Sequence, residues 1–183
     1  MRRQIIVILK DCEELRNNIP QICRCVVNGL LISHGLRKDT NLSIHLLRDE
    51  INIVFRGSTL KRIYPDEASL KGVLLKAFRV LGHESRRATP HPGVVVKALP
   101  LKKLFGDAPK PRFFFSRGGR NPLRENLRPP VSFAIYSDSL EYYLRPILRE
   151  LDFRPLFLPS SLSSLELKVV AAQFLIDLSL VRV

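Results

Sequence analysis

The chain has 183 residues, 45% of them hydrophobic, so it can bury the core of one domain or of two small ones. No apolar run reaches the roughly 18 residues that a membrane-spanning helix needs. Three cysteines exclude a disulfide framework without a leftover thiol, and the formal net charge of +13 favours a polyanionic partner.

The positive charge is concentrated in the middle of the chain. Residues 86–128 contain 11 Lys and Arg against 2 Asp and Glu, whereas residues 129–183 contain 5 against 6. A focused positive field indicates nucleic acid as the partner, with a merely basic surface as the alternative. Within this region, the turn-rich and basic residues 116–122 are predicted to form a mobile binding loop.

The first apolar run, residues 4–9, follows Arg2-Arg3 as it would in a signal peptide. The run is too short, and Lys10-Asp11 stands where a cleavage site needs small residues. We therefore predict a first buried strand in a cytoplasmic protein. No cluster of His, Cys or carboxylates has metal-ligand spacing, so no metal is expected.

Strand-like and helical segments then alternate along the chain. The patterns predict helices at 19–34, 65–82, 138–151 and from 165 onward, and strands at 4–9, 42–47, 51–55, 93–96, 112–115, 131–136 and 154–158. The strands at 42–47 and 51–55 should form a hairpin. The alternation favours an α/β domain whose mainly parallel sheet has helices on both faces, with ligand loops at 137–139 and 158–164.

The stretch 22–39 carries the main candidate site. Its apolar or small residues fall on one helix face, and Gly35 is expected to end that helix. A polar cluster follows at Ser33, His34, Arg37, Lys38 and Asp39. The cluster favours a polyanion site, with a solvated basic helix end as the alternative.

The motifs at 23–26 and 33–39 resemble those of the archaeal tRNA pseudouridine N1-methyltransferases (TrmY family), which belong to the trefoil-knotted SPOUT methyltransferases. The resemblance continues at 55–62, 65–67, 89–90 and 92–93, and more faintly at 162–167. It implies a homodimeric enzyme that uses S-adenosylmethionine to methylate N1 of pseudouridine 54 in the T loop of tRNA. It also implies a single domain, with a substrate-binding half at 1–128 and a C-terminal knotted cofactor half at 129–183.

The resemblance also implies roles for individual residues. Asp39 would accept the N1 proton, and Arg37 would stabilise the developing negative charge, although a salt bridge to a neighbouring arginine is the structural alternative for Asp39. The implied substrate-binding residues are Arg24, Ser33, His34, Lys38, Lys61 and Arg62. The implied cofactor-binding residues are Ile135, Tyr136, Ser137, Asp138, Leu158, Ser163, Leu165 and Leu167.

Two segments depart from the family's pattern. The loop 137–141 lacks the glycine that lets a cofactor approach the backbone, and Lys168 to Ala172 replace a polar set at the start of the last helix. A non-catalytic RNA-binding relative, and methylation of another RNA or base, therefore remain alternatives. The apolar residues Phe174, Leu175, Leu178 and Leu180 exceed one buried face, which favours a homodimer.

Overall fold

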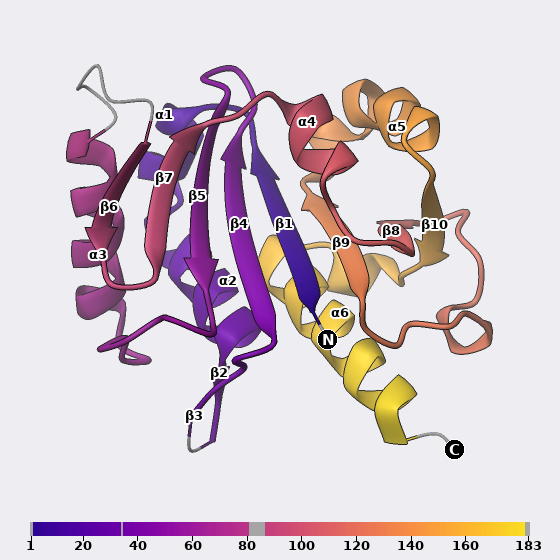
Figure 1. Cartoon of the computed structure of the whole chain (residues 1–183). Helices are drawn as coiled ribbons and strands as arrows, with labels where there is room; N and C mark the ends of the chain where they lie inside the picture. Colours follow the sequence, from indigo (N-terminus) through magenta and orange to yellow (C-terminus); the bar gives the residue numbers. More distant parts are fainter. Residues whose placement is uncertain (1, 34, 81–86, 182–183) are drawn as a thin grey trace.

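The computed structural model describes residues 2–33, 35–80 and 87–181. In this part of the chain eight strands form one sheet in the order β10-β8-β9-β1-β4-β5-β7-β6, with helices on both faces (Figure 1). The strands are β1 (Arg3–Leu9), β4 (Thr40–Leu46), β5 (Ile51–Arg56), β6 (Arg87–His91), β7 (Val94–Ala98), β8 (Arg112–Ser116), β9 (Val131–Tyr136) and β10 (Phe153–Phe157).

The sheet has a parallel part and an antiparallel part. The strands β10, β8, β9, β1 and β4 pair in parallel, whereas β4, β5, β7 and β6 pair antiparallel in succession. The predicted hairpin is confirmed, because β4 and β5 are joined by a short turn with Asn41 opposite Arg56. The α/β class and the mainly parallel sheet are likewise confirmed, since four of the seven strand pairings in the described sheet are parallel.

Helices cover the two faces unequally. On one face lie α1 (Cys12–Asn17), α2 (Ile19–Leu30), α3 (Glu67–Arg79) and α6 (Leu165–Val181), over the inward side chains of Ile5, Val7 and Leu9. On the other lie α4 (Leu101–Gly106) and α5 (Glu141–Glu150), packed against Ile6 and Ile8. The strand residues of this second core come from β1, β8, β9 and β10. The same face of β4, β5 and β7 lies outside it and carries polar side chains such as His45, Asn52 and Lys97.

The helix predicted at 19–34 is shorter than expected. Helix α2 ends at Leu30, and the backbone of Leu31 is extended. A small two-stranded ribbon follows, β2 (Leu31–Ile32) and β3 (Gly35–Leu36), closed by a hydrogen bond from the Arg37 amide to the Leu30 carbonyl. The prediction that Gly35 ends the helix is therefore wrong, because this ribbon satisfies the backbone groups that a longer helix would have used.

The predicted apolar faces of the helices are confirmed. Along α2 the side chains of Ile22, Cys25, Val26 and Leu30 are buried, and α6 buries Leu165, Val169, Ala172 and Ile176. Gly29 permits the close packing of α2, since a Cβ there would lie 2.4 Å from Leu42 Cδ1. Helix α3 ends at Arg79, ahead of the predicted Gly82, which lies outside the described residues.

Candidate active site

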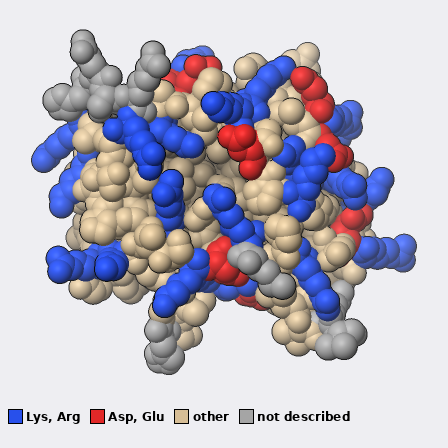
Figure 2. All heavy atoms as spheres, in the orientation of Figure 1, with Lys and Arg blue, Asp and Glu red and all other residues tan. Residues whose placement is uncertain are grey.

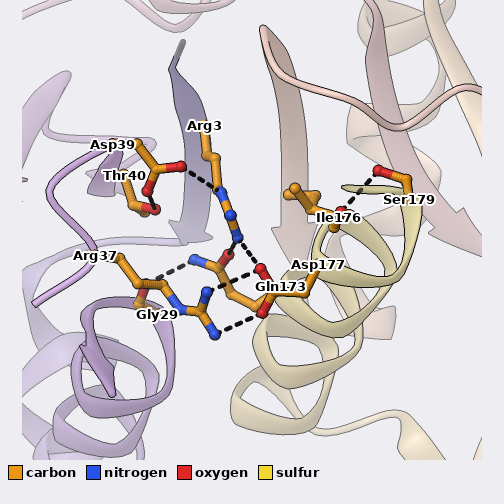
Figure 3. A network of polar contacts seen from close by, with 9 residues as sticks. All are labelled: Arg3, Gly29, Arg37, Asp39, Thr40, Gln173, Ile176, Asp177 and Ser179. Atoms are coloured by element: carbon orange, nitrogen blue, oxygen red, sulfur yellow. Dashed lines mark hydrogen bonds and ion pairs between the residues drawn. The ribbon is translucent and has the colours of Figure 1, made fainter. Parts of the chain in front are cut away.

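A network of charged side chains ties the first strand to the last helix (Figure 3). Arg3 begins β1 and is 5% exposed. Its Nε donates to Asp39 Oδ2 at 2.8 Å, and its Nη1 donates to Gln173 Oε1 at 3.0 Å and to Asp177 Oδ1. A buried guanidinium needs such partners, because leaving one unpaired costs several kcal/mol. Arg3 therefore fixes the position of Asp39 relative to α6.

Arg37 belongs to the same network but faces α6. Its Nη2 lies 2.8 Å from Asp177 Oδ2, so its charge is paired with the helix carboxylate. Gly57 holds the backbone on the other side of this segment, where its amide donates to the Thr40 carbonyl at 2.9 Å. A Cβ on Gly57 would lie 2.1 Å from the Arg37 carbonyl oxygen, so only glycine fits. The segment that carries Asp39 is thus held rigidly from both sides.

Asp39 also faces a pocket of about 420 Å³ at the amino ends of β1 and β4. One carboxylate oxygen accepts from Arg3 and the other accepts from Thr40 Oγ1 at 3.2 Å, while the side chain stays 36% exposed. The predicted salt bridge and the predicted exposure to a ligand therefore coexist. The pocket is lined by Arg2, Lys38, Asp39, Asn41, Arg56 and Ser58.

This arrangement can hold an anionic ligand and accept a proton from it. Three cations surround a single carboxylate, which suits a phosphate-bearing ligand whose reacting atom must lose a proton. Because the hydrogen bond from Arg3 orients the carboxylate, no side-chain reorganisation is needed at the moment of transfer.

The structure gathers only some of the residues predicted for substrate binding. Lys38 lies in the pocket beside Asp39. Arg24 lies on α2 and pairs with Glu166 at 3.3 Å, and Ser33 is exposed in the turn between β2 and β3. Lys61 and Arg62 are exposed in the segment after β5, three and four residues beyond Ser58 of the pocket. His34 lies outside the described residues.

A second, largely apolar pocket of about 600 Å³ lies where β8 and β10 end. The loop after β8 forms one wall, the loop after β10 another, and α6 the third. A Cβ on Gly119 would lie 2.1 Å from the Leu156 carbonyl carbon, so glycine alone lets the first loop reach β10. The lining residues are Gly119, Asn121, Pro122, Leu123, Phe157, Leu158, Pro159, Leu162, Ala171, Phe174 and Leu175.

The loop that carries Gly119 is held by backbone pairing. The amide of Arg120 donates to the Pro155 carbonyl at 2.9 Å, and the Phe157 amide donates to the Arg120 carbonyl at 2.8 Å. The prediction of a mobile loop at 116–122 thus overlooked that this loop adds a bridge to β10. Its role in lining a pocket could have been inferred from the Gly118-Gly119 pair after an apolar strand.

The loop after β9 is fixed by a buried lysine. Lys168 is 6% exposed, and its Nζ donates to the Tyr136 carbonyl at 2.8 Å and to Asp138 Oδ1 at 3.0 Å. Burial raises the pKa of the Tyr136 hydroxyl, which is therefore neutral at physiological pH. Lys168 thus holds the glycine-free loop after β9 in place against α6.

The residues predicted to bind the cofactor separate into four groups. Leu158 lines the apolar pocket, and Asp138 and Ser163 line a neighbouring polar cleft of about 30 Å³ together with Leu158. Ser137 Oγ lies 2.7 Å from Ser139 Oγ in the loop after β9. The remaining four predicted residues line neither space; three are buried and one is exposed on α6: Ile135, Tyr136, Leu165 and Leu167.

We expect Lys168→Met to destabilise the fold by about 1.5–3 kcal/mol, the usual loss when buried hydrogen bonds from a charged group disappear. The matched control is Lys102→Met, because the Lys102–Glu150 pair is exposed on both sides. Its loss should cost between 0 and about 1 kcal/mol. Urea unfolding of the two variants measures the difference, and equal losses would contradict a structural role for Lys168.

Asp177 should make stability depend on pH. Burial opposes its ionisation, but hydrogen bonds from Arg37 and Arg3 outweigh burial and hold the pKa of Asp177 below its ordinary value. Its stabilising contribution is therefore complete above about pH 4 and is lost as the pH falls through the lowered pKa. The free energies of unfolding of the wild type and Asp177→Asn should differ most near pH 7 and converge on acidification. A constant difference would contradict this assignment.

Among the described residues, none of the helices is long and apolar enough to cross a membrane, and no His, Cys, Asp and Glu side chains gather as a metal site would require. The fold is similar to that of a known structure, "Crystal structure of Archaeoglobus Fulgidus Nep1 bound to S-adenosylhomocysteine". The TM-score is 0.65 over 97% of this chain and 98% of that chain, with 15% sequence identity. The likeness shows that the two chains share one α/β fold.

Residues 10–132 match the model of the family described as "Putative SAM-dependent RNA methyltransferase". The chain belongs to this family. The resemblance noted in its motifs is thereby confirmed.

Several relatives are named tRNA (pseudouridine(54)-N(1))-methyltransferase. The Haloarcula marismortui protein is 31% identical over 45% of this chain and 43% of its own length. The Methanosarcina acetivorans protein is 31% identical over 67% of this chain and 61% of its own length. The Methanopyrus kandleri protein is 29% identical over 62% of this chain and 56% of its own length. The chain thus spans about half the length of the relatives that it matches.

Proposed function

We propose that this protein transfers a methyl group from S-adenosylmethionine to N1 of the pseudouridine at position 54 of tRNA. The observation that carries the proposal is Asp39, a carboxylate oriented by a buried arginine inside a pocket of cations. Membership of the family and the names of the relatives support the same activity.

The residues of the apolar pocket fit the proposed cofactor. A volume of about 600 Å³ lies in the range of small-molecule sites, and its apolar walls suit an adenine ring. Gly119 and Pro159 bring backbone close to this space, and the Asn121 side chain adds a polar group at its wall. Bound there, S-adenosylmethionine would supply an electrophilic methyl group.

The chain's own residues would manage the proton and the charge. As N1 of pseudouridine forms its bond to the methyl carbon, the bond from that carbon to sulfur breaks and the N1 proton must leave. Asp39 is placed to accept it, while Lys38 and Arg56 in the same pocket would neutralise phosphate and carbonyl charge. Arg37, paired with Asp177, would act by positioning the segment that carries Asp39.

A homodimer is part of the proposal. The Asp39 pocket lies at the amino ends of β1 and β4, whereas the apolar pocket lies where β8 and β10 end, and these strands are parallel. A second protomer could bring its cofactor pocket to the first protomer's Asp39. Helix α6 also exposes apolar side chains, with Phe174 61% and Val170 42% exposed. A monomer at micromolar concentration in sedimentation experiments would contradict the dimer.

A C-terminal trefoil knot is proposed for the same half. The chain between β8 and β9 pairs with β10 through Arg120 and then crosses α6, where Arg128 Nε donates to the Ser179 carbonyl at 3.0 Å. On its other side α6 packs against β1 and β9. A helix lying between a loop and the sheet supports threading of the C-terminal segment through that loop.

The proposal is tested by calorimetric titration of S-adenosylmethionine into the purified protein, followed by methylation of a T-loop RNA that contains pseudouridine. We expect micromolar binding, and a methylated product that is absent when uridine replaces pseudouridine. Absence of cofactor binding at millimolar concentration, with and without tRNA, would overturn the methyltransferase and favour an RNA-binding relative.

A further inference from the structure

The sheet face over β4, β5 and β7 carries an uninterrupted row of polar side chains. In the strand register His45 lies beside Ile8 on one side and Asn52 on the other, and Asn52 lies beside Lys97. The next row on this face is Ser43, Val54 and Val95, and in the row after it Asn41 lies beside Arg56. Figure 2, in the orientation of Figure 1, shows Lys and Arg side chains spread over this view of the molecule, where they outnumber the acidic side chains. The role of this face is not explained by the two pockets described above.

A cavity of about 100 Å³ lies between this face and α4; we call it the sheet-face cavity. Its apolar wall is formed by Leu99, Leu104 and Ala108, and its polar side includes Ser43 and Asn52. Three cations, Arg2, Arg56 and Lys97, line it together with one carboxylate, Asp107. Arg2 and Arg56 also line the Asp39 pocket, so the two spaces adjoin.

Asn52 is the unusual residue of this cavity. Its side chain is 1% exposed, and within the described residues neither its amide oxygen nor its amide nitrogen has a hydrogen-bond partner. Its neighbour Gln4, by contrast, donates to Ser43 Oγ at 2.9 Å. A buried amide without partners destabilises a fold, because its polar atoms have lost their hydrogen bonds to water. Retaining it is understandable if a ligand in the cavity completes its hydrogen bonds.

The chemistry of the lining indicates which ligand fits. A carboxamide offers a donor and an acceptor side by side, which is how Asn pairs with the edge of a nucleobase. Arginine and lysine at the rim suit the phosphates on either side of that base. His45, opposite Asn52, adds no charge, because burial lowers its pKa to about 4. RNA loops offer unstacked bases that can enter such a space.

We propose that the sheet-face cavity is a second nucleotide subsite, in which Asn52 binds the edge of an unstacked base of the RNA substrate. Arg2, Arg56 and Lys97 hold the adjoining phosphates. The subsite rests on the proposed function, since it takes a nucleotide next to the one in the Asp39 pocket. It would select the RNA by the sequence or shape around the modified base.

The experiment measures binding of a fluorescent T-loop hairpin RNA to Asn52→Leu, Lys97→Ala and the control Lys76→Ala by anisotropy at several salt concentrations. Lys76 is exposed on α3, which covers the opposite face. We expect Asn52→Leu to weaken binding by about tenfold, in the range of a lost base contact. Lys97→Ala should reduce the slope of log affinity against log salt by about 0.7–0.9, and Lys76→Ala should leave the slope unchanged.

Abasic substitutions along the RNA loop locate the base. At one position other than the methylated one, the abasic RNA should bind the wild type as weakly as the intact RNA binds Asn52→Leu. The same abasic RNA should bind Asn52→Leu no more weakly than the intact RNA does. Thermal melting of each variant checks the fold, and the surface variant Lys97→Ala gives a result independent of the buried site. Wild-type affinity for Asn52→Leu, or an unchanged salt slope for Lys97→Ala, would show that the cavity holds only water.

Methyl transfer measured on the same preparations separates this inference from the proposed function. If the wild type transfers methyl groups but Asn52→Leu binds the RNA with wild-type affinity, the subsite alone is overturned. RNA binding that depends on Asn52, without any transfer by the wild type, would support the subsite while the proposed reaction fails.

Discussion

Gly119→Ala is expected to raise the dissociation constant for S-adenosylmethionine at least about tenfold, because the new methyl group would collide with the backbone of Leu156 and Phe157. To relieve the collision, the loop after β8 must move away from β10. Both hydrogen bonds of Arg120 with that strand would break, and one wall of the apolar pocket would be displaced. Calorimetric titration of the cofactor measures the effect.

The neighbouring glycine provides the matched control. A Cβ built on Gly118 meets nothing within 4 Å, so Gly118→Ala should bind the cofactor as the wild type does. Both variants add one methyl group to the same loop, and they differ only in what that group contacts. Equal cofactor affinities for the two variants would exclude this loop from the cofactor site.

Asp39→Asn is expected to lower the rate of methyl transfer by about 10²–10⁴-fold, the usual contribution of a positioned general base. The amide keeps the size of the side chain and can still accept a hydrogen bond from Arg3, but it cannot accept the N1 proton. Single-turnover measurements at saturating cofactor and RNA isolate this step. The dissociation constants of the two ligands should change far less than the rate.

Asp177→Asn is the control for the loss of an ion pair. Asp177 also binds Arg3, but it does not line the Asp39 pocket. Its substitution should lower stability and loosen Arg3 and Arg37, so the transfer rate should fall, but far less than in Asp39→Asn. If the two variants lose rate equally, the role of Asp39 is structural and the proton acceptor lies elsewhere.

The sequence patterns predicted which segments form strands and helices more accurately than they predicted where those elements end. Runs such as Val131 to Tyr136 can only be buried strands, and the apolar spacing along α6 determines which face it buries. The end of α2 was misplaced because the ribbon of β2 and β3 is set by a hydrogen bond from Arg37 to Leu30, which no local periodicity encodes. Tertiary contacts therefore decided that boundary.

For the candidate site, local motifs located Lys38 and Asp39 but not the distant residues that contact them. Lys38 and Asp39 were found because they stand together in one motif, and both line the pocket at the start of β4. The partnership of Asp39 with Arg3 could not be predicted, since 36 residues separate them. The apolar pocket draws on three distant segments. Two of them were predicted as binding loops, at 116–122 and 158–164, but Leu158 is the one predicted cofactor-binding residue that lines this pocket. Contacts between remote segments carry no signature in a single sequence.

The link between Arg3 and Asp177 spans 174 residues and has a consequence for synthesis on the ribosome. Strand β1 emerges first, and its arginine has no helix carboxylate to bind until α6 has left the exit tunnel. Until then, the nascent chain would have to keep a cation that is destined for burial in contact with water or with a chaperone. A stalled chain that lacks α6 should therefore resist compaction around β1, and release of the last helix should complete the fold in one late step.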